Sequence, residues 1–117
     1  MNLANQKCVP CQWDAPKLKP GAARAKLTQI KGWKLIEHND KIQREFEFTD
    51  FVHAMKFVNK IAQIAERIGH HPDFFVSWNR VTVTIYTHKI QGLHANDFIL
   101  AAKINAIKQT LKNPKRV

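Results

Sequence analysis

The feature that most constrains the fold is a run of apolar residues at helical spacing between Phe51 and Ile68. The run comprises Phe51, Met55, Val58, Ile61, Ala62, Ala65 and Ile68. Such spacing places the apolar side chains on one face of a helix, which must be buried against another element. Thr49 or Asp50 can cap the start, and Gly69 favours the end. The pattern predicts one long amphipathic helix.

A pair of extended segments is predicted before this helix. Trp33 to His38 and Lys41 to Phe48 flank Asn39-Asp40, a two-residue turn signal. Ile42, Phe46 and Phe48 fall on one face at a period of two, as in a strand with one buried face. The segments are expected to form a β-hairpin.

A second hairpin is predicted after the helix. Phe74 to Trp78 and Val81 to Thr87 flank a turn at Asn79-Arg80, and the later segment is rich in β-branched residues. Val81, Val83 and Ile85 share the apolar face, so this face should meet the helices.

Shorter helices are predicted at both ends of the chain. Pro20 suits a first helical position ahead of Ala22 to Ile30, and Gly32 ends that run. Asn96 or Asp97 can cap a last helix that ends before Asn113-Pro114. Its apolar face is formed by Leu100, Ile104, Ile107 and Leu111.

The resulting order, α-β-β-α-β-β-α, predicts an α+β fold with a four-stranded antiparallel sheet and three helices on one face. The chain has 117 residues, enough for one domain. We expect that domain over residues 21–117, preceded by a flexible arm over residues 1–20. Trp33, Phe46, Trp78 and Tyr86 exceed what one core can hold, so a subunit interface on the open face or edge of the sheet is expected.

Hydropathy, cysteine content and charge argue against several classes of function. No apolar run is long enough for a membrane helix, and residues 1–10 lack a signal-peptide pattern, so a cytoplasmic location is expected. Cys8 and Cys11 supply at most half of a structural zinc site. The net charge is +10, but the basic residues are spread along the chain and no nucleic-acid-binding motif is present. A dedicated nucleic-acid role is therefore not expected.

Residues suited to chemistry are concentrated in one region. Gly69-His70-His71-Pro72 is followed by Trp78, His88 and Asp97. Imidazole both gives and takes protons near neutral pH, so the histidines are candidates for acid–base work. Asp97 can orient a histidine or cap a helix, and the sequence leaves both roles open.

This constellation resembles the signature of the pterin-4a-carbinolamine dehydratases. The family pattern has an acidic or polar residue before His-His-Pro, then an aromatic residue, a histidine and an aspartate. The chain carries Glu66, His70-His71-Pro72, Trp78, His88 and Asp97 in that order. Asp50-Phe51, Asn79-Arg80-Val81, Thr87-His88 and Gly92-Leu93 also look like phrases of the family. The resemblance covers roughly residues 22 to 112.

The resemblance implies the α+β fold above, assembled as a homodimer or homotetramer. It also implies a hydro-lyase that removes water from a 4a-hydroxytetrahydropterin, giving the quinonoid dihydropterin for tetrahydrobiopterin recycling. Pterin is then the substrate, and neither a metal nor a cofactor is used. A pterin-dependent aromatic amino acid hydroxylase is the implied partner that supplies the substrate.

Site residues carried over by the resemblance fall into two groups. The implied catalytic group is His70, His88, His71 and Asp97. We take His70 as the acid and His88 as the base, although the sequence does not fix this division. The implied substrate-binding group is His71, Pro72, Glu66, Phe75, Trp78, Tyr86 and Thr87. Trp78 also suits packing at a strand end, and Glu66 an exposed helix position. His38, His53 and His94 match no signature role and are interpreted as surface histidines.

Two alternatives come from other function classes. His70, His71, His88 and Asp97 include enough ligands for a zinc or iron site, although neighbouring residues in an extended loop tend to point apart. A non-enzymatic interaction or regulatory protein of the same fold is the second alternative.

Overall fold

The computed structural model of the protein describes residues 3–6 and 16–108. Its elements are η1 (Leu3–Asn5), α1 (Pro20–Leu27), β1 (Lys34–Ile36), β2 (Lys41–Glu47), α2 (Phe51–Ile68), β3 (Asp73–Ser77), β4 (Arg80–Ile85), η2 (His88–Ile90) and α3 (Ala95–Asn105). The η elements are single turns of 3-10 helix. The order of the α-helices and strands confirms the predicted α-β-β-α-β-β-α arrangement.

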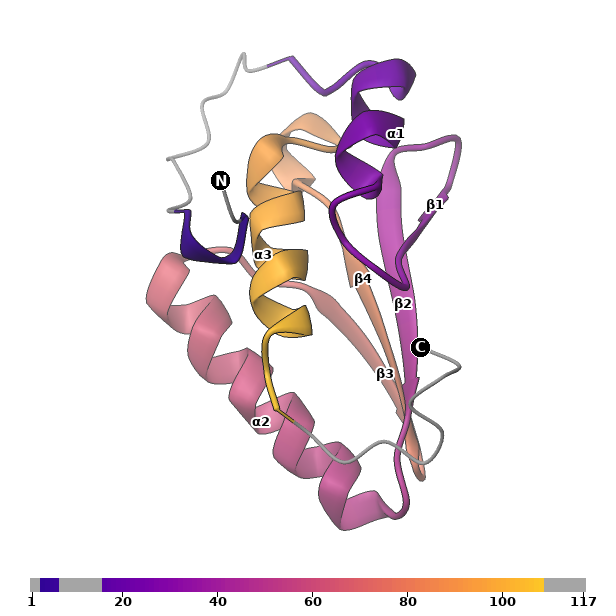
Figure 1. The fold of residues 1–117 in the computed structure, drawn as a ribbon, viewed down its shortest axis with the longest axis vertical. Helices are drawn as coiled ribbons and strands as arrows, with labels where there is room; N and C mark the ends of the chain where they lie inside the picture. Colours follow the sequence, from indigo (N-terminus) through magenta and orange to yellow (C-terminus); the bar gives the residue numbers. More distant parts are fainter. Residues whose placement is uncertain (1–2, 7–15, 109–117) are drawn as a thin grey trace.

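The four strands form one antiparallel sheet in the order β1-β2-β4-β3. Phe46 of β2 lies opposite Val81 of β4, and Phe74 of β3 lies opposite Val83. The helices lie together on one side of the strands, and α2 runs obliquely below α3 (Figure 1). This topology leaves β1 and β3 as the two edges of the sheet.

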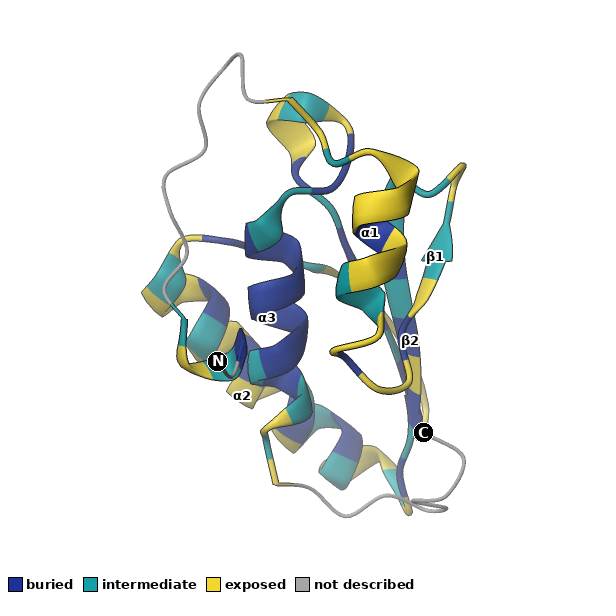
Figure 2. Ribbon diagram, turned by 45° about the horizontal axis from the view of Figure 1, so that its top comes forward, coloured by how far each residue is buried: buried dark blue, intermediate teal, exposed yellow. Residues whose placement is uncertain are grey.

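The core lies between the sheet and the helices. Val81, Val83 and Ile85 are fully buried, which confirms the predicted apolar face of β4. The Phe46 and Phe57 rings, from β2 and α2, have centroids 4.6 Å apart. The helix α3 is buried along most of its length, whereas α1 is largely exposed (Figure 2). The core therefore centres on α3.

The helix α2 has the predicted bounds, but its buried face is shifted, because Ala54 and Phe57 are buried with Ile61 and Ala65 whereas Phe51 and Ala62 are exposed. Asp50 caps its start, because its Oδ1 accepts a hydrogen bond of 2.8 Å from the His53 backbone N–H. This bond is the main reason why the pKa of the Asp50 carboxyl is lowered from its ordinary value. At the other end Gly69 adopts φ 71°, a left-handed conformation that suits glycine, and its N–H bonds to the Ala65 carbonyl.

Both predicted hairpin turns were misplaced. The first connection runs over residues 37–40, and Glu37, His38 and Asn39 all have positive φ, so the turn is longer than Asn39-Asp40. The second turn is formed by Trp78 and Asn79. The buried Asn79 side chain donates to the Phe48 carbonyl, and the Asn79 carbonyl accepts from the Phe48 N–H. These bonds fix Asn79 in the turn, which leaves Arg80 free to begin β4.

The predicted cap of α3 was also wrong. The N-cap is His94, whose Nδ1 accepts a hydrogen bond of 3.2 Å from the Asn96 N–H. Oδ2 of Asp97 accepts a hydrogen bond from the His94 backbone N–H, so the two residues form a reciprocal capping box. An imidazole nitrogen thus takes the place of the expected short polar side chain, and His94 is not simply a surface histidine.

Two parts of the predicted arm contact the domain. Leu3 is buried in the core cluster, and Lys103 of α3 donates to the Ala4 carbonyl. Farther along, the Leu18 N–H donates to the Leu93 carbonyl at 2.8 Å. The expectations for Cys8, Cys11 and the chain beyond residue 108 lie outside the described residues.

Four aromatic residues were expected to be too many for one core. Some of them lie in the core and others on the surface. Trp33 and Phe46 are buried, and Tyr86 is half-buried against the core. Trp78 is 66% exposed, which corrects the expectation that it packs at the strand end. Phe75 on the same edge strand is also 66% exposed.

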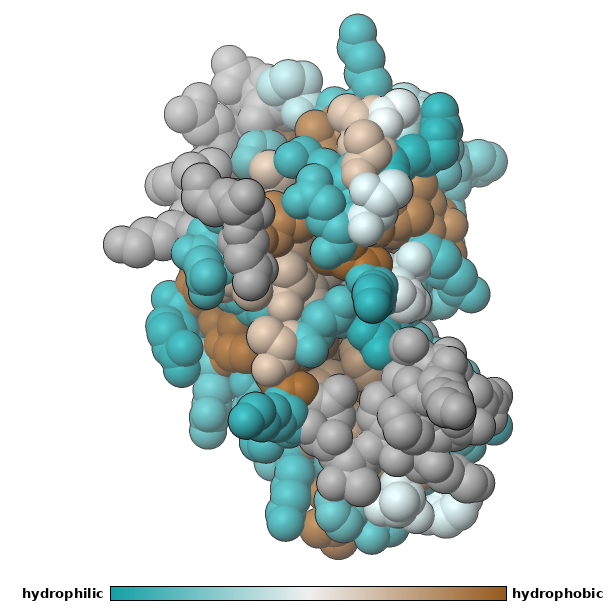
Figure 3. All heavy atoms as spheres, in the orientation of Figure 1, coloured by the Kyte–Doolittle hydropathy of each residue, from teal (hydrophilic) through white to brown (hydrophobic). Residues whose placement is uncertain are grey.

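On the face shown in Figure 3, hydrophilic side chains project around the margin and hydrophobic residues show between them. No helix in the described part of the chain has both the length and the apolar character to cross a membrane.

Candidate active site

The candidate site forms where α2 ends, β3 begins, β4 ends and α3 begins. Each predicted histidine lies at one of these ends. His70 and His71 follow α2, and His88 opens the single turn η2 that follows β4. Asp97 lies in the first turn of α3. The topology therefore gathers residues that are up to 27 positions apart in the sequence.

Asp97 is the centre of the buried part of the site. Its side chain is fully buried, and both of its oxygens accept hydrogen bonds. Oδ1 lies 2.5 Å from Nε2 of His70. Oδ2 accepts from the Thr87 hydroxyl at 2.9 Å and from the His94 backbone N–H at 2.8 Å. The carboxylate is thus held from three directions and has a fixed orientation.

His70 owes its position to the end of α2. Gly69 turns the chain out of the helix, while the His70 N–H still bonds to the Ala65 carbonyl at 3.2 Å. The His70 residue is 9% exposed. Because Nε2 faces Asp97, the ring nitrogen left for a substrate is Nδ1. Asp97 therefore both closes the capping box of α3 and orients His70.

His71 points into a different environment from His70. Its Nε2 lies 3.3 Å from Glu66 Oε2, one turn back on α2. The side chains are 58% and 79% exposed, respectively, so this ion pair adds little to stability. The pair joins two residues of the implied substrate-binding group, and Pro72 beside them is partly exposed.

His88 has neighbours of its own. Its ring meets the Tyr86 ring edge to face, with centroids 4.3 Å apart. Its Nε2 lies 4.0 Å from Oδ1 of Asp73 at the start of β3, and both side chains are more than half exposed. Asp73 was not among the predicted residues, although it directly follows Pro72. Within the site, His70 and His88 thus each have an aspartate neighbour, one buried and one open to water.

Not all of the remaining predicted residues lie near the site histidines. Thr87 is buried and donates to Asp97, so it lies within the site. Phe75 lies in the middle of the edge strand β3, and Trp78 follows the end of that strand away from Asp73. At about 3.3 Å per residue the strand separates Ser77 from Asp73 by roughly 13 Å, and Trp78 lies beyond Ser77. Within one chain, Trp78 is therefore remote from the histidines.

The candidate metal ligands are not brought together in the described structure. Among residues 3–6 and 16–108, no three His, Cys, Asp or Glu side chains are arranged to hold a metal ion. His94 was missed as a member of the Asp97 network. The spacing His94-x-x-Asp97 was the available signal, since it is that of a capping box with histidine in the first position.

The chain is similar to known proteins over most of its length. The family model described as pterin 4 alpha carbinolamine dehydratase matches residues 16–107. A relative from Alkaliphilus metalliredigens (strain QYMF) is 42% identical over 105 residues, covering 89% of this chain and 94% of the relative. One from Azoarcus sp. (strain BH72) is 44% identical and covers 90% of each chain. The names of both relatives assign them to the pterin-4-alpha-carbinolamine dehydratases.

A solved structure is similar in fold. It is a transcriptional coactivator/pterin dehydratase from Brucella melitensis, 36% identical, with a TM-score of 0.73 over 77% of this chain and 96% of that chain. Sequence and fold thus lead to the same assignment. The chain belongs to the pterin-4a-carbinolamine dehydratase family of hydro-lyases.

Proposed function

We propose that this chain removes water from a 4a-hydroxytetrahydropterin by general acid–base catalysis through His70 and His88. The observation that carries this proposal is the buried pairing of His70 with Asp97 at 2.5 Å, together with the more exposed His88, which directly follows Thr87, a second partner of the same aspartate. Family membership supplies the reaction class, and the two imidazoles supply groups that exchange protons near neutral pH.

The proposed reaction needs a proton at one atom and removes a proton from another. An acid protonates the hydroxyl on carbon 4a, and water leaves with the electrons of the C–O bond. A base takes the proton from the adjacent ring nitrogen, and a C=N bond forms, which gives the quinonoid dihydropterin. General acid–base help of this kind is worth ~10²- to 10⁴-fold.

We assign the acid to His70 and the base to His88. Nε2 of His70 faces the Asp97 carboxylate, which leaves Nδ1 as the nitrogen that can give a proton to the hydroxyl. His88 has only a distant carboxylate neighbour and lies more open to water. We therefore give His88 the role of the base.

We propose that the pterin is held by His71, Glu66, Pro72 and Tyr86. His71 and Pro72 directly follow His70, Glu66 contacts His71, and Tyr86 contacts His88. In the proposed reaction, side chains carry the protons, and neither a metal ion nor a cofactor takes part. Its biological setting would be tetrahydrobiopterin recycling after a pterin-dependent hydroxylase.

Stopped-flow absorbance of 4a-hydroxytetrahydropterin dehydration tests the proposal. We expect wild type to accelerate the reaction, and His70→Ala and His88→Ala each to lower the rate by about tenfold or more. His53→Ala is the matched control, because His53 also contacts an aspartate, Asp50, but lies at the far end of α2. Folded wild type without acceleration would contradict the proposal. A rate that survives both substitutions would contradict the assigned roles.

A homo-oligomer is also proposed, and the edge strand β3 supports it. Phe74, Phe75 and Trp78 are exposed along this edge, at 37%, 66% and 66% respectively. An edge with exposed aromatic residues is a surface for pairing with another chain. The Brucella neighbour is described as a transcriptional coactivator as well as a dehydratase, so a regulatory partner is the second candidate for such a surface.

A further inference from the structure

We propose that the segment ahead of α1, residues 16–18, is a strap that positions His88 for the proposed reaction, so the inference rests on the proposed function. Its positioning residues are Lys17 and Leu18, and neither is among the residues proposed for the site. The strap lies at the end of the molecule where α3 begins (Figure 1), and there it contacts the chain just after His88. The His88 side chain is 55% exposed, so its position depends on the backbone that carries it.

His88 lies in a short loop, residues 87–92, that is closed at its base. The Thr87 N–H donates to the Gly92 carbonyl at 2.9 Å, and the Gly92 N–H donates to the Thr87 carbonyl at 3.4 Å. Within the loop, the Gln91 side chain donates to the His88 carbonyl at 2.8 Å. The place of the imidazole is therefore set by whatever holds the two residues at the base.

Different parts of the molecule hold the two ends of this loop. Thr87 is held from inside the domain, because its hydroxyl donates to Oδ2 of Asp97 at 2.9 Å. The other end continues into Leu93, whose carbonyl accepts from the Leu18 N–H at 2.8 Å. Leu93 is 1% exposed, and Leu18 is partly buried against the core. One end of the loop is thus fixed by a buried carboxylate, and the other is fixed by the strap.

Gly92 shows how closely the strap approaches the loop. Its φ lies outside the left-handed region, so its backbone conformation does not require glycine. A Cβ on Gly92 would clash with Cδ of Lys17 and would lie 2.8 Å from Cβ of Lys17, which is closer than carbon atoms pack. Only a residue without a side chain lets Lys17 lie over the loop at this position, so the strap accounts for the glycine.

The aliphatic stem of Lys17, and not its charge, makes this contact. Its Cβ, Cγ and Cδ are the atoms nearest to the place that a side chain on Gly92 would occupy. The ammonium group contacts Oδ1 of Asp40 at 3.2 Å, in the connection between β1 and β2. The side chains of this ion pair are 50% and 33% exposed, so the pair contributes little. Packing and the Leu18 hydrogen bond are therefore expected to carry the positioning.

The first test follows the imidazole signals of the full chain, labelled at histidine, by NMR without substrate. Gly92→Ala displaces the strap, and Lys17→Gly removes its stem without changing the loop. We expect the His88 ring signals to shift or broaden in both variants, and to stay in place in Lys17→Met and Asp40→Asn, which lose the charge but keep a stem.

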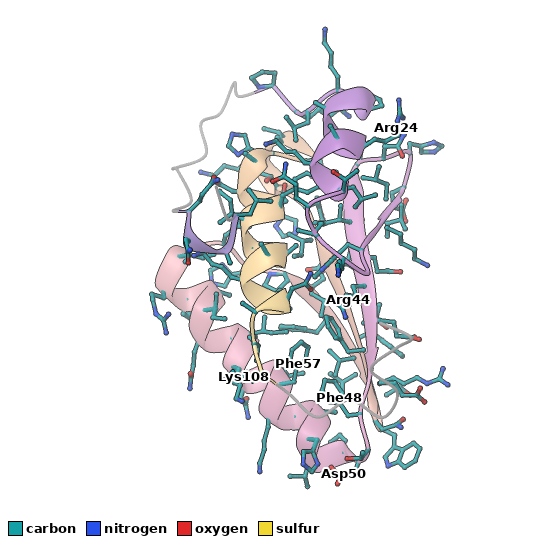
Figure 4. The ribbon with its side chains drawn as sticks, in the orientation of Figure 1. Arg24, Arg44, Phe48, Asp50, Phe57 and Lys108 are labelled. Atoms are coloured by element: carbon teal, nitrogen blue, oxygen red, sulfur yellow. The ribbon has the colours of Figure 1, made fainter. Side chains whose placement is uncertain are left out.

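His53 is the internal control for these spectra. It contacts Asp50, which lies at the opposite end of the molecule from Arg24 in α1, the helix that follows the strap (Figure 4). Its ring signals should be the same in every variant. Unchanged His88 signals in both Gly92→Ala and Lys17→Gly would overturn the proposal.

The second test measures dehydration kinetics in the same variants. A misplacement of about 1 Å can cost 10²-fold, so we expect Gly92→Ala to lower kcat by about tenfold and to change KM by less than about twofold. Adding Lys17→Gly to Gly92→Ala removes the clash, so the double variant should recover to within about threefold of the wild-type kcat. A double variant as slow as Gly92→Ala, or a wild-type kcat in Gly92→Ala, would overturn the proposal.

These results are distinguishable from a failure of the proposed function. If folded wild type does not accelerate dehydration, the proposed function fails, and the His88 ring signals still decide whether the strap positions that residue. If wild type is active and His88→Ala is slow, the proposed function stands, and the variants of Gly92 and Lys17 test the strap alone. Circular dichroism confirms that each variant is folded. Should Gly92→Ala fail to fold, Lys17→Gly gives the same test, because Lys17 is exposed.

Discussion

Nε2 of His70 lies 2.5 Å from Oδ1 of Asp97, and the aspartate is fully buried. The same carboxylate caps α3 through the His94 N–H and accepts from the Thr87 hydroxyl. A group that caps a helix and orients a proposed acid links the stability of the domain to its chemistry.

Substitution of Asp97 should separate these two roles. Asp97→Asn keeps an oxygen for capping but loses the charge beside His70, so we expect a rate lower by up to roughly 10²-fold with the fold retained. Asp97→Ala leaves buried polar groups without partners and should lower the free energy of unfolding by about 3–5 kcal/mol. Dehydration kinetics and urea unfolding check the two expectations. An Asp97→Asn variant with wild-type kinetics would show that the charge of Asp97 is not needed.

Asn79 should matter for stability and not for catalysis. Its side chain is 3% exposed and donates to the Phe48 carbonyl at 2.9 Å. Asn79→Ala leaves that buried carbonyl without this partner, so we expect a loss of about 1–3 kcal/mol in the free energy of unfolding. Urea denaturation measures the loss. Kinetics per folded molecule should be unchanged, and a large change in rate would mean that the turn reaches the site.

The two glycines near the start of the domain should respond to alanine with opposite signs. Gly32 has φ 87°, and a Cβ there would lie 2.6 Å from Arg44 Nε, so Gly32→Ala should destabilise the fold by more than about 1 kcal/mol. Gly21, in α1, has nothing within 4 Å of such a Cβ. Gly21→Ala should therefore stabilise by about 0.5–1 kcal/mol. Thermal unfolding of both variants checks the pair, and equal effects would argue against the tight contact at Gly32.

Asp50 should make stability depend on pH in the acid range. Its pKa is lowered in the folded state, so its contribution is present above the ordinary value of 3.8 and is lost as pH falls through the lower folded pKa. The difference in unfolding free energy between wild type and Asp50→Asn should shrink over that range. Urea unfolding at a series of pH values from neutral downward measures it. A difference that does not vary with pH would show that the Asp50 charge plays no part.

Phe75 should affect assembly and not folding. It is 66% exposed on the edge strand, so Phe75→Lys removes an apolar surface without opening the core. We expect a smaller particle by size-exclusion chromatography with light scattering, and an unchanged monomer fold by circular dichroism. Val52→Lys is the control, because Val52 is 59% exposed on α2. Dissociation by the control alone would place the interface on α2.

Much of the fold was predictable because the spacing of apolar residues shows where a helix or a strand runs, although in α2 it named Phe51 as buried and missed Phe57. The helix from Phe51 to Ile68 and its end at Gly69 follow from spacing and from one residue that tolerates positive φ. The turns were less predictable, because tertiary contacts decide them. Asn79 carries an ordinary turn signal, but its position is set by a hydrogen bond to Phe48, which is 31 residues away.

The sequence indicated which residues belong to the candidate site, but it did not indicate how they contact one another. The signature identified His70, His88 and Asp97, but spacing along the chain cannot show which histidine meets the aspartate. Arg44 had no signal that set it apart. It lies in the buried register of β2 between Ile42 and Phe46, where an apolar residue was the natural expectation. Only the contacts of its guanidinium with the Asn105 side chain and the Lys31 carbonyl show why a cation is tolerated there.

The position of Asp97 has a consequence for how activity arises in a newly made chain. The carboxylate contacts His70 just beyond α2, Thr87 just beyond β4 and the cap of α3. These segments acquire that arrangement only when all of them have docked. Under the proposed mechanism, a partly folded molecule would therefore be inactive, and proton transfer would begin only with the last step of folding.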